Sequence, residues 1–437
     1  MTPATAACGA GRLLPRLLPR VTGTTGSQSV QLAGVLVRLQ QGAAAAAAAA
    51  ARRRAVRCSS SSSAGGAAEP SPSAAAAAAD EKKRVVFCGT PEVAALVLQR
   101  LLAAAAAPDS TFEVAAVVTQ PPRPTGRGNR KVPQPSPVQA AAAAAGLPAE
   151  RILAPEKPGD PAFLAALRQL APDLCITAAY GNYLPSSFLA VPPHGTLNIH
   201  PSLLPAYRGA APVQRSLQDG VPVSGVTVLY TVKAMDAGPI LAQQKLPVDP
   251  DIQAPELLQR LFELGTDLLV KNLEVVWAGM GPLVAQPQND AAATHAAKLT
   301  REEAVLDFSQ PAAVCHNKVR AFVPWPGTFA TFAMVDPSSS SSNGSESSSS
   351  GSSGETIELK IVRTRVGQPS SWQSGSEREV AATKDALLIR CADGSVLEVL
   401  ELQAPGKRAM AARDFVNGLK GRSLVWQPLQ TPAGVAA

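Results

Sequence analysis

Short apolar runs and amphipathic helical patterns alternate along the chain over residues 83–278. The first run, Arg84–Thr90, is broken at Gly89 and leads into the helix-like segment Glu92–Ala107. Strands that alternate with helices at this spacing form parallel sheets, because each connecting helix must pack its apolar face against the sheet. The sequence therefore predicts an α/β fold with a Rossmann-like, mainly parallel open sheet that carries helices on both faces.

The other elements of this first domain, which we place at 83–285, follow the same alternation. Apolar β-rich runs predict strands, and apolar side chains with a spacing near 3.6 residues predict helices. The predicted strands are Val114–Thr119, Arg151–Leu153, Leu174–Ala179, Thr196–His200 and Val226–Val232. The predicted helices are Val138–Ala145, Ala162–Ala171, Ala211–Leu217 and Pro255–Ala278. A loop rich in Pro, Gly and Arg is expected over Gln120–Pro137.

The character of the chain changes after about residue 286. Residues 286–325 are expected to form a linker and a helix, Ala312–Ala321. Short β-rich runs separated by glycine and polar turns then follow, at Thr328–Val335, Ile357–Val362, Ala386–Arg390 and Val396–Leu402. This pattern is typical of a small antiparallel β-barrel, OB-like, over 326–430. The serine-rich insert 338–353 cannot bury apolar surface, so we expect a disordered loop there.

Residues 1–79 differ from the rest of the chain in composition. They contain eight arginines, no lysine and one acid, Glu69, in a background of Ala, Ser, Gly and Pro. This balance accounts for the whole formal net charge of +7, so the remainder of the chain is close to neutral. Such a composition is typical of an organellar transit peptide, which we expect to be disordered. A merely disordered Ala-rich tail is the alternative.

Several classes of protein are disfavoured by what the sequence lacks. No stretch of 18 consecutive apolar residues occurs, so we expect no membrane span. The six cysteines are single and widely spaced, which fits neither a zinc site nor a disulfide scaffold, and we expect no metal. Only Gly89 stands where a dinucleotide-binding fold carries G-x-G-x-x-G, so an NAD-dependent oxidoreductase is disfavoured.

Two polar side chains flank an apolar one at the end of a predicted strand. Asn198 and His200 should point to the same face, and Ile199 into the core, since side chains alternate along a strand. The carboxyl ends of strands in an α/β sheet line the usual ligand crevice. Asp236 follows another strand. We therefore expect an amide, an imidazole and a carboxylate to lie together.

These three groups suit the attack of an amine on a formyl carbon. The amide can donate a hydrogen bond to the oxyanion that develops on the formyl oxygen, and the imidazole can relay a proton near neutral pH. The carboxylate is expected to fix the tautomer of the imidazole. Each residue alone is more often structural than catalytic, so only the combination indicates chemistry.

Longer motifs around these residues resemble the folate-dependent formyltransferases: His200-Pro-Ser-Leu-Leu-Pro, Tyr207-Arg-Gly-Ala-Ala-Pro and Met235-Asp-Ala-Gly. Further segments resemble the methionyl-tRNA formyltransferases in particular, and the resemblance covers about 83–422. These segments are Val85-Val-Phe-Cys-Gly-Thr-Pro-Glu, Thr119-Gln-Pro-Pro-Arg-Pro-Thr-Gly-Arg-Gly, Ala178-Ala-Tyr-Gly and Leu402-Gln-Ala-Pro-Gly-Lys-Arg-Ala-Met.

The resemblance implies roles for individual residues. Asn198, His200 and Asp236 correspond to the catalytic trio. The loop that cradles 10-formyltetrahydrofolate corresponds to Ser202, Leu203, Leu204 and Pro205. The loop Gln120–Lys131 corresponds to an element that enters the tRNA acceptor stem, and its basic residues Arg123, Arg127, Arg130 and Lys131 suit phosphate contacts. Lys407 and Arg408, in a basic C-terminal stretch, are the further candidates for tRNA backbone contacts.

The implied reaction is transfer of the formyl group of 10-formyltetrahydrofolate to the α-amino group of initiator methionyl-tRNA. The composition of residues 1–79 predicts that the protein is located in an organelle matrix, with the mitochondrion slightly preferred over the chloroplast. We also expect the protein to be a monomer. The alternative within the same chemistry is a formyltransferase acting on an amino sugar or other small amine. A purine-pathway formyltransferase would lack the barrel, and a formyl-folate hydrolase would carry a regulatory domain in place of the leader. A catalytically silent tRNA-binding module is disfavoured because the trio is intact.

Two positions near Asp236 depart from the family pattern. Lys233 stands where an acid or apolar residue is usual, and Pro239 replaces a frequent acid. Both changes lie in the segment that carries the carboxylate, so we expect them to alter its surroundings without removing a catalytic group. The serine insert in the barrel is a third departure.

Overall fold

The computed structural model describes residues 82–125, 132–336, 355–372 and 376–428. The leader 1–79, the serine-rich insert 338–353, and Arg127, Arg130 and Lys131 lie outside these residues. The division of the chain into two units falls between Ala79 and Asp80. The described part therefore belongs to the second unit.

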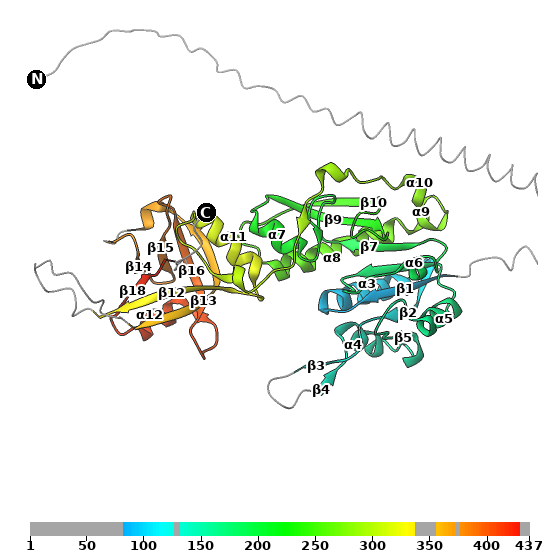
Figure 1. Cartoon of the computed structure of the whole chain (residues 1–437), viewed down its shortest axis with the longest axis horizontal. Coiled ribbons are helices and arrows are strands. Elements are labelled where there is room, and N and C mark those ends of the chain that lie inside the picture. Colours follow the sequence, from blue (N-terminus) through cyan, green and yellow to red (C-terminus); the bar gives the residue numbers. More distant parts are fainter. Residues whose placement is uncertain (1–81, 126–131, 337–354, 373–375, 429–437) are drawn as a thin grey trace, which may run out of the picture. The chain divides into compact units, whose positions relative to one another are not determined.

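A seven-stranded sheet organises the first domain among the described residues, in the order β10-β9-β7-β6-β1-β2-β5 (Figure 1). Strands β7, β6, β1, β2 and β5 run parallel, whereas β9 and β10 form an antiparallel edge beside β7. The strands are β1 Lys83–Gly89, β2 Phe112–Val118, β5 Ile152–Leu153, β6 Leu174–Ala178, β7 Thr196–His200, β9 Val223–Tyr230 and β10 Ile240–Pro247.

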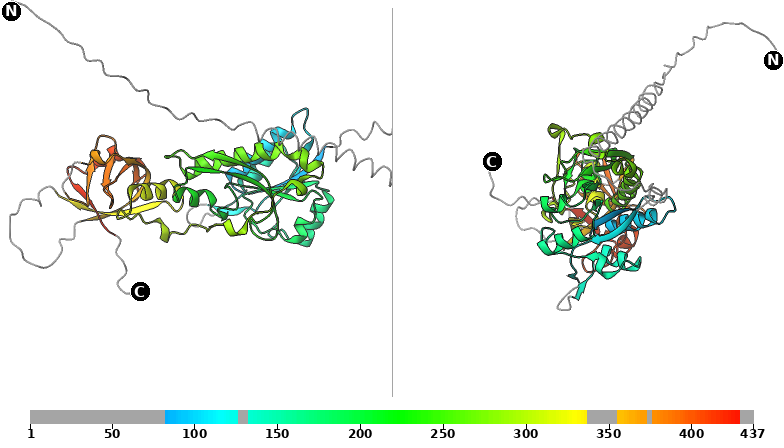
Figure 2. Two further views of the ribbon diagram at one scale, coloured as in Figure 1. Left: turned by 90° about the horizontal axis from the view of Figure 1, so that it is seen from above. Right: turned by 90° about the vertical axis from the view of Figure 1, so that its right-hand side faces the viewer.

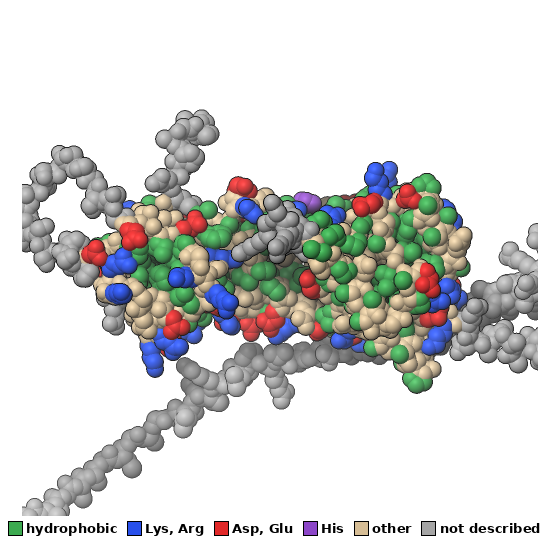
Figure 3. Space-filling view, turned by 90° about the horizontal axis from the view of Figure 1, so that it is seen from below, with side chains coloured by type: hydrophobic (Ala, Val, Ile, Leu, Met, Phe, Trp, Pro, Cys, Tyr) green, Lys and Arg blue, Asp and Glu red, His purple; other side chains and the backbone are tan. Residues whose placement is uncertain are grey.

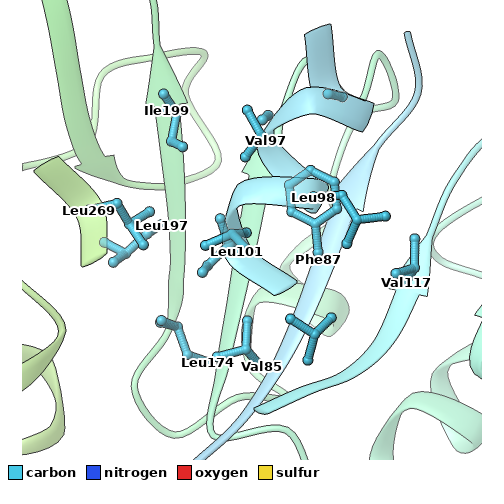
Figure 4. Close-up of a cluster of buried hydrophobic side chains, with 14 of the residues drawn as sticks. Val85, Phe87, Val97, Leu98, Leu101, Val117, Leu174, Leu197, Ile199 and Leu269 are labelled. Carbon is cyan, nitrogen blue, oxygen red and sulfur yellow. The ribbon is translucent and has the colours of Figure 1, made fainter. Parts of the chain in front are cut away.

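Helices cover both faces of this sheet because its strands are buried on both sides. Along β1, Val85 and Phe87 join the core under one set of helices, and Val86 and Cys88 join the core under the other. Figure 4 shows the first of these cores, with Leu98 of α3 facing the sheet. The helices on this face are α3 Glu92–Ala105, α4 Pro137–Ala144, α8 Ala254–Lys271 and α9 Leu273–Trp277, and those on the other are α5 Pro161–Gln169 and α6 Ser186–Leu189. The predicted α/β fold is confirmed.

Three details differ from the sequence-based expectation. The single long helix predicted over Pro255–Ala278 is two helices, α8 and α9, which meet at Asn272. The antiparallel edge strand β10 was not predicted. The expected loop Gln120–Pro137 carries a two-stranded ribbon, β3 Arg123–Thr125 paired with β4 Val132–Gln134.

The C-terminal part forms a closed antiparallel barrel (Figure 2). Six strands follow one another in the order β13-β12-β18-β14-β15-β16, and pairing of β13 with β16 closes the ring. They are β12 Thr328–Val335, β13 Thr356–Gly367, β14 Glu379–Ala382, β15 Leu387–Arg390, β16 Val396–Gln403 and β18 Ser423–Trp426. Helix α11, Ala312–Phe322, adds Cys315 and Val319 to the barrel core. The predicted barrel is confirmed, although β14 and β18 were not predicted.

The surface of the described part carries charges of both signs. Figure 3 shows acidic and basic side chains interspersed over one face. None of the helices in the described ranges is long and apolar enough to cross a membrane. Cys88, Cys175, Cys315 and Cys391 are buried free thiols, and no group of three or more potential metal-ligating side chains gathers among the described residues.

Candidate active site

The carboxyl end of β7 brings two of the predicted residues to one edge of the sheet. Between them, Ile199 is 1% exposed and belongs to the core that α3 and α8 cover; Figure 4 shows it in one cluster with Val97 of α3 and Leu269 of α8. The His200 side chain is almost as buried, at 4% exposed for the residue. A short strand with a buried central residue thus carries a half-buried Asn198 and a buried His200 to the same edge of the sheet.

The amide of Asn198 is oriented by a neighbouring strand. Thr177 of β6 lies opposite Asn198 in the parallel register, and its hydroxyl donates a 2.8 Å hydrogen bond to Asn198 Oδ1. Because the hydroxyl holds the oxygen end of the amide, Nδ2 and its two protons face away from Thr177. The arrangement presents a donor for a developing oxyanion. Thr177 was not predicted as a site residue.

The imidazole of His200 is held by a backbone carbonyl. His200 Nε2 lies 2.9 Å from the carbonyl oxygen of Tyr207. A carbonyl oxygen only accepts, so Nε2 carries a proton and the neutral ring has its lone pair on Nδ1. His200 Nδ1 lies 3.7 Å from Asp236 Oδ1, which is beyond hydrogen-bond range. Nδ1 is therefore the nitrogen that can take a proton, and the resulting imidazolium would face the carboxylate.

This geometry corrects one expectation. The tautomer of His200 is fixed by the Tyr207 carbonyl, whereas Asp236 was expected to fix it. A main-chain acceptor contributes no side-chain signature to the sequence, which is why sequence reasoning missed it. At 3.7 Å, the carboxylate of Asp236 faces Nδ1 without a hydrogen bond, so the two groups interact only through space.

Asp236 lies in the connection between β9 and β10, and its backbone is strained. Its φ is +50°, in a region that residues with a side chain rarely adopt. The backbone N–H of Gly209 donates a 2.9 Å hydrogen bond to Asp236 Oδ2, which fixes the carboxylate. A Cβ at Gly238 would lie 1.7 Å from the Tyr230 carbonyl oxygen, so only glycine fits there.

The two departures from the family pattern leave the carboxylate in place. Lys233 is exposed. The carbonyl of Pro239 accepts a 2.9 Å hydrogen bond from the backbone N–H of Tyr230 and so closes the base of the same connection. The proline thus takes part in the fold of the loop through its main chain.

The proposed folate loop is tied to the body of the domain by its own polar groups. Ser202 and Leu204 are 1% and 3% exposed, and the Ser202 hydroxyl donates to the carbonyl of Ala206 at 2.7 Å. Thr227 Oγ1 donates to the Ser202 carbonyl at 2.7 Å and accepts from the Leu204 N–H at 3.1 Å. Leu203 and Pro205 are half-buried, so they and the main chain are what this loop offers a ligand.

The candidate tRNA residues lie apart in the sequence and on different elements. Arg123 is exposed on β3 of the ribbon. Lys407 and Arg408 are exposed in the turn between β16 and β17, Met410–Ala411. Arg127, Arg130 and Lys131 lie outside the described residues, so their role stays a prediction.

Comparisons with known proteins identify the family of the chain. The "Formyl transferase" family profile matches residues 82–273, and the "Formyl transferase, C-terminal domain" profile matches 298–420. A methionyl-tRNA formyltransferase of Roseiflexus castenholzii is 39% identical over 313 residues, which cover 71% of this chain and 90% of that protein. One of Thermus thermophilus is 38% identical and covers 70% and 88%.

Solved structures give only a distant likeness. An N-formyltransferase from Helicobacter canadensis, in complex with folinic acid and dTDP-3-aminofucose, is 15% identical with a TM-score of 0.49, covering 74% of this chain and 100% of that one. That likeness has no bearing on the function of this chain. From the two profile matches and the bacterial relatives, the chain belongs to the formyl transferase family, among the methionyl-tRNA formyltransferases.

Proposed function

We propose that this protein transfers the formyl group of 10-formyltetrahydrofolate to the α-amino group of initiator methionyl-tRNA in an organelle matrix. The observation that carries the proposal is the buried imidazole of His200 facing the half-buried carboxylate of Asp236, beside the oriented amide of Asn198. The names of the relatives, at 38–39% identity over most of their length, support methionyl-tRNA as the acceptor.

The three side chains supply what an amine needs to attack a formyl carbon. The amine nitrogen forms a bond to the formyl carbon, and the bond from that carbon to the folate nitrogen breaks after the tetrahedral stage. The amide N–H of Asn198 stabilises the oxyanion on the formyl oxygen. His200 Nδ1 takes the proton that the amine loses and returns it to the leaving nitrogen, so the charge balances. Asp236 stabilises the imidazolium between these two transfers.

The organellar assignment is supported by composition alone. Residues 1–79 are Arg-rich and nearly free of acids, and the first family match begins directly after them, at residue 82. Such segments direct proteins to mitochondria or chloroplasts. Microscopy of the full chain and of a chain without residues 1–79, each fused to a fluorescent protein, tests this part separately: diffuse signal from the full chain would overturn it.

The function is tested by incubating the full chain with 10-formyltetrahydrofolate and either charged initiator tRNA or a nucleotide-linked amino sugar. We expect N-formylmethionyl-tRNA, and a loss of kcat of about 10²–10⁴-fold in His200→Ala, the range for a general acid–base group. Asp236→Asn, which keeps the acceptor for Gly209 N–H but removes the charge, should also lose most turnover. Formylation of the sugar alone would establish the alternative acceptor, and normal kcat in both variants would refute the assigned roles.

A further inference from the structure

A short segment between the two family matches crosses the catalytic site. The matches end at residue 273 and resume at 298. Within this gap, Gln288–Ala296 lies against the Arg208–Gly209 strand and the Asp236 loop. Its strand β11, His295–Ala296, pairs with β8, Arg208–Gly209. We call Gln288–Ala296 the clamp segment.

The side chain of Gln288 bridges the Asp236 loop and Arg208. Gln288 Nε2 donates to the carbonyl oxygens of Asp236 at 2.7 Å and of Gly238 at 2.8 Å. Arg208 Nε and Nη2 donate to Gln288 Oε1 at 3.0 and 2.7 Å. All the polar atoms of the amide are therefore engaged, and its two ends are not interchangeable, because carbonyls cannot donate and a guanidinium cannot accept.

The residue next to Arg208 contacts the catalytic carboxylate. Gly209 N–H donates to Asp236 Oδ2, and Gly209 lies where a Cβ would come within 2.8 Å of the Ala296 carbonyl. Arg208 is also paired with Asp290 of the clamp segment at 2.7 Å. Gln288 thus binds the main-chain carbonyl of Asp236. The side-chain carboxylate of Asp236 is bound by Gly209, which belongs to the strand β8 that pairs with β11.

The clamp segment reaches His200 through Tyr207. Thr294 Oγ1 accepts a 2.8 Å hydrogen bond from the backbone N–H of Tyr207, and the Thr294 carbonyl accepts from the N–H of Arg208 at 2.9 Å. Tyr207 has φ +61°, and it is the residue whose carbonyl holds His200 Nε2. The Thr294 carbonyl holds the peptide unit that contains the Tyr207 carbonyl, and the Thr294 hydroxyl holds the preceding peptide unit. Together they set the φ of Tyr207 and so the direction of its carbonyl.

Both supported residues hold unfavourable backbone conformations. Asp236 and Tyr207 are non-glycine residues with φ of +50° and +61°. Such conformations persist only where surrounding contacts impose them. Gln288 and Thr294 supply contacts of this kind at both positions, although neither side chain belongs to the predicted catalytic trio.

We propose that the clamp segment is part of the catalytic centre, with Gln288 and Thr294 as positioning residues for Asp236 and His200. The proposal rests on the proposed function, because it concerns the same formyl transfer. Neither residue needs to touch a substrate. Replacing either Gln288 or Thr294 should therefore lower kcat while KM for either substrate changes little.

The first test is Gln288→Glu in the full chain. The variant keeps the contact with Arg208 but places a carboxylate oxygen against the Asp236 and Gly238 carbonyls, where an N–H donated. We expect kcat to fall roughly 10²-fold, the effect of a misplacement near 1 Å, with KM within about twofold. Gln286→Glu is the matched control: it adds the same charge two residues away on an exposed side chain that bonds only to the Val284 carbonyl, and it should keep wild-type kcat.

The second test separates positioning from stability. Thr294→Val removes the acceptor for Tyr207 N–H at nearly constant size, and Thr294→Ser retains it. We expect roughly tenfold loss of kcat in the valine variant and recovery in the serine variant. The ¹⁵N spectrum of histidine-labelled protein gives a readout without substrate: the neutral His200 ring should carry its proton on Nε2 in the wild type and show mixed tautomers in Thr294→Val.

The outcomes distinguish this proposal from the proposed function. If the wild type forms no N-formylmethionyl-tRNA, the function is wrong, and the ¹⁵N comparison still tests the tautomer. If the wild type is active while Gln288→Glu and Thr294→Val keep normal kcat, the positioning role is overturned. A loss of kcat that tracks a fall in Tm and disappears at a lower assay temperature would reduce both residues to structural ones and equally overturn it.

Discussion

Gly265, in the middle of α8, is expected to set the position of the catalytic strand. Alanine is about 1 kcal/mol more favourable than glycine inside a helix, so glycine here requires a packing reason. A Cβ at Gly265 would lie 2.5 Å from Ile199 Cγ2 and 2.6 Å from Val226 Cγ2. Ordinary contacts begin at 3.4 Å, so a Gly265→Ala variant must separate α8 from β7 by about 0.9 Å.

The cost follows from two opposing terms. Overpacking of this size costs roughly 1–3 kcal/mol, and the helix propensity of alanine returns about 1 kcal/mol. Both contacted methyl groups stand on strands held by neighbours on each side, which favours the upper half of the range. We expect a net loss of about 1–2 kcal/mol, or a Tm lower by roughly 2–8 °C.

Catalysis should suffer more than stability. Ile199 stands between Asn198 and His200, so a displacement of β7 moves both groups, and a shift near 1 Å can cost about 10²-fold in rate. Thermal melts and kcat at 25 °C measure the two effects. Gly418→Ala is the control, because nothing lies within 4 Å of a Cβ there. A Gly265→Ala protein with an unchanged or raised Tm and normal kcat would show that the close approach has no such role.

Two further predictions concern single hydrogen-bonded side chains. Thr177→Val removes the donor that orients the Asn198 amide. A hydrogen bond of about 1 kcal/mol biases the two amide orientations only severalfold, so kcat should fall roughly two- to tenfold. Asn198→Ala should lose roughly 10²–10³-fold in kcat, and equal losses in the two variants would refute the orienting role of Thr177. Burial lowers the pKa of His316, whose Nε2 bonds the Pro250 carbonyl at 2.9 Å. As pH falls below about 6.5, the unfolded chain therefore binds more protons than the folded chain, and the stability of the folded state declines. Between pH 7 and 5.5, the Tm of His316→Gln should fall less than the Tm of the wild type.

The parts of the site that the sequence predicted are those with a side-chain pattern. Alternation of Asn198, Ile199 and His200 at a strand end implied two polar groups over a buried one, and the structure has this arrangement. Thr177 lies within the predicted strand Leu174–Ala179, and its hydroxyl has no signature in the sequence until the parallel register places Asn198 opposite. The apolar periodicity of a single strand does not tell which residue of a strand distant in sequence will lie opposite it.

The missed features of the fold have a similar origin. The helical pattern continues through Asn272, so the break between α8 and α9 could not be seen in apolar spacing. Strand β10 is an edge strand with exposed Gln244 and Lys245, and such strands lack the continuous apolar run of a central one. Residues 286–296 fall within the segment 286–325, for which the sequence predicts only a linker and the helix Ala312–Ala321. Their contribution consists mainly of hydrogen bonds: Gln288 donates to main-chain carbonyls, Thr294 Oγ1 accepts from a main-chain N–H, and Gln288 also accepts from the Arg208 side chain.

The distribution of strained residues links these observations. Five non-glycine residues of the described part have positive φ: Ala171, Ala179, Tyr207, Asp236 and Lys420. Ala171 and Lys420 directly follow the C-caps of α5 and α12, Ala412–Gly418, where a left-handed residue is the common way to end a helix.

The other three end no helix, and all lie at the catalytic edge. Ala179 follows β6, and the carbonyl of the next residue, Tyr180, accepts hydrogen bonds from Thr90 and Gln120. Tyr207 is held by Thr294 and Asp236 by Gln288. Each strained turn thus has its main chain bound by a side chain from another segment. Conformations that cost about 1–3 kcal/mol each require such support, so we expect substitution of the supporting side chains to displace the proposed catalytic groups.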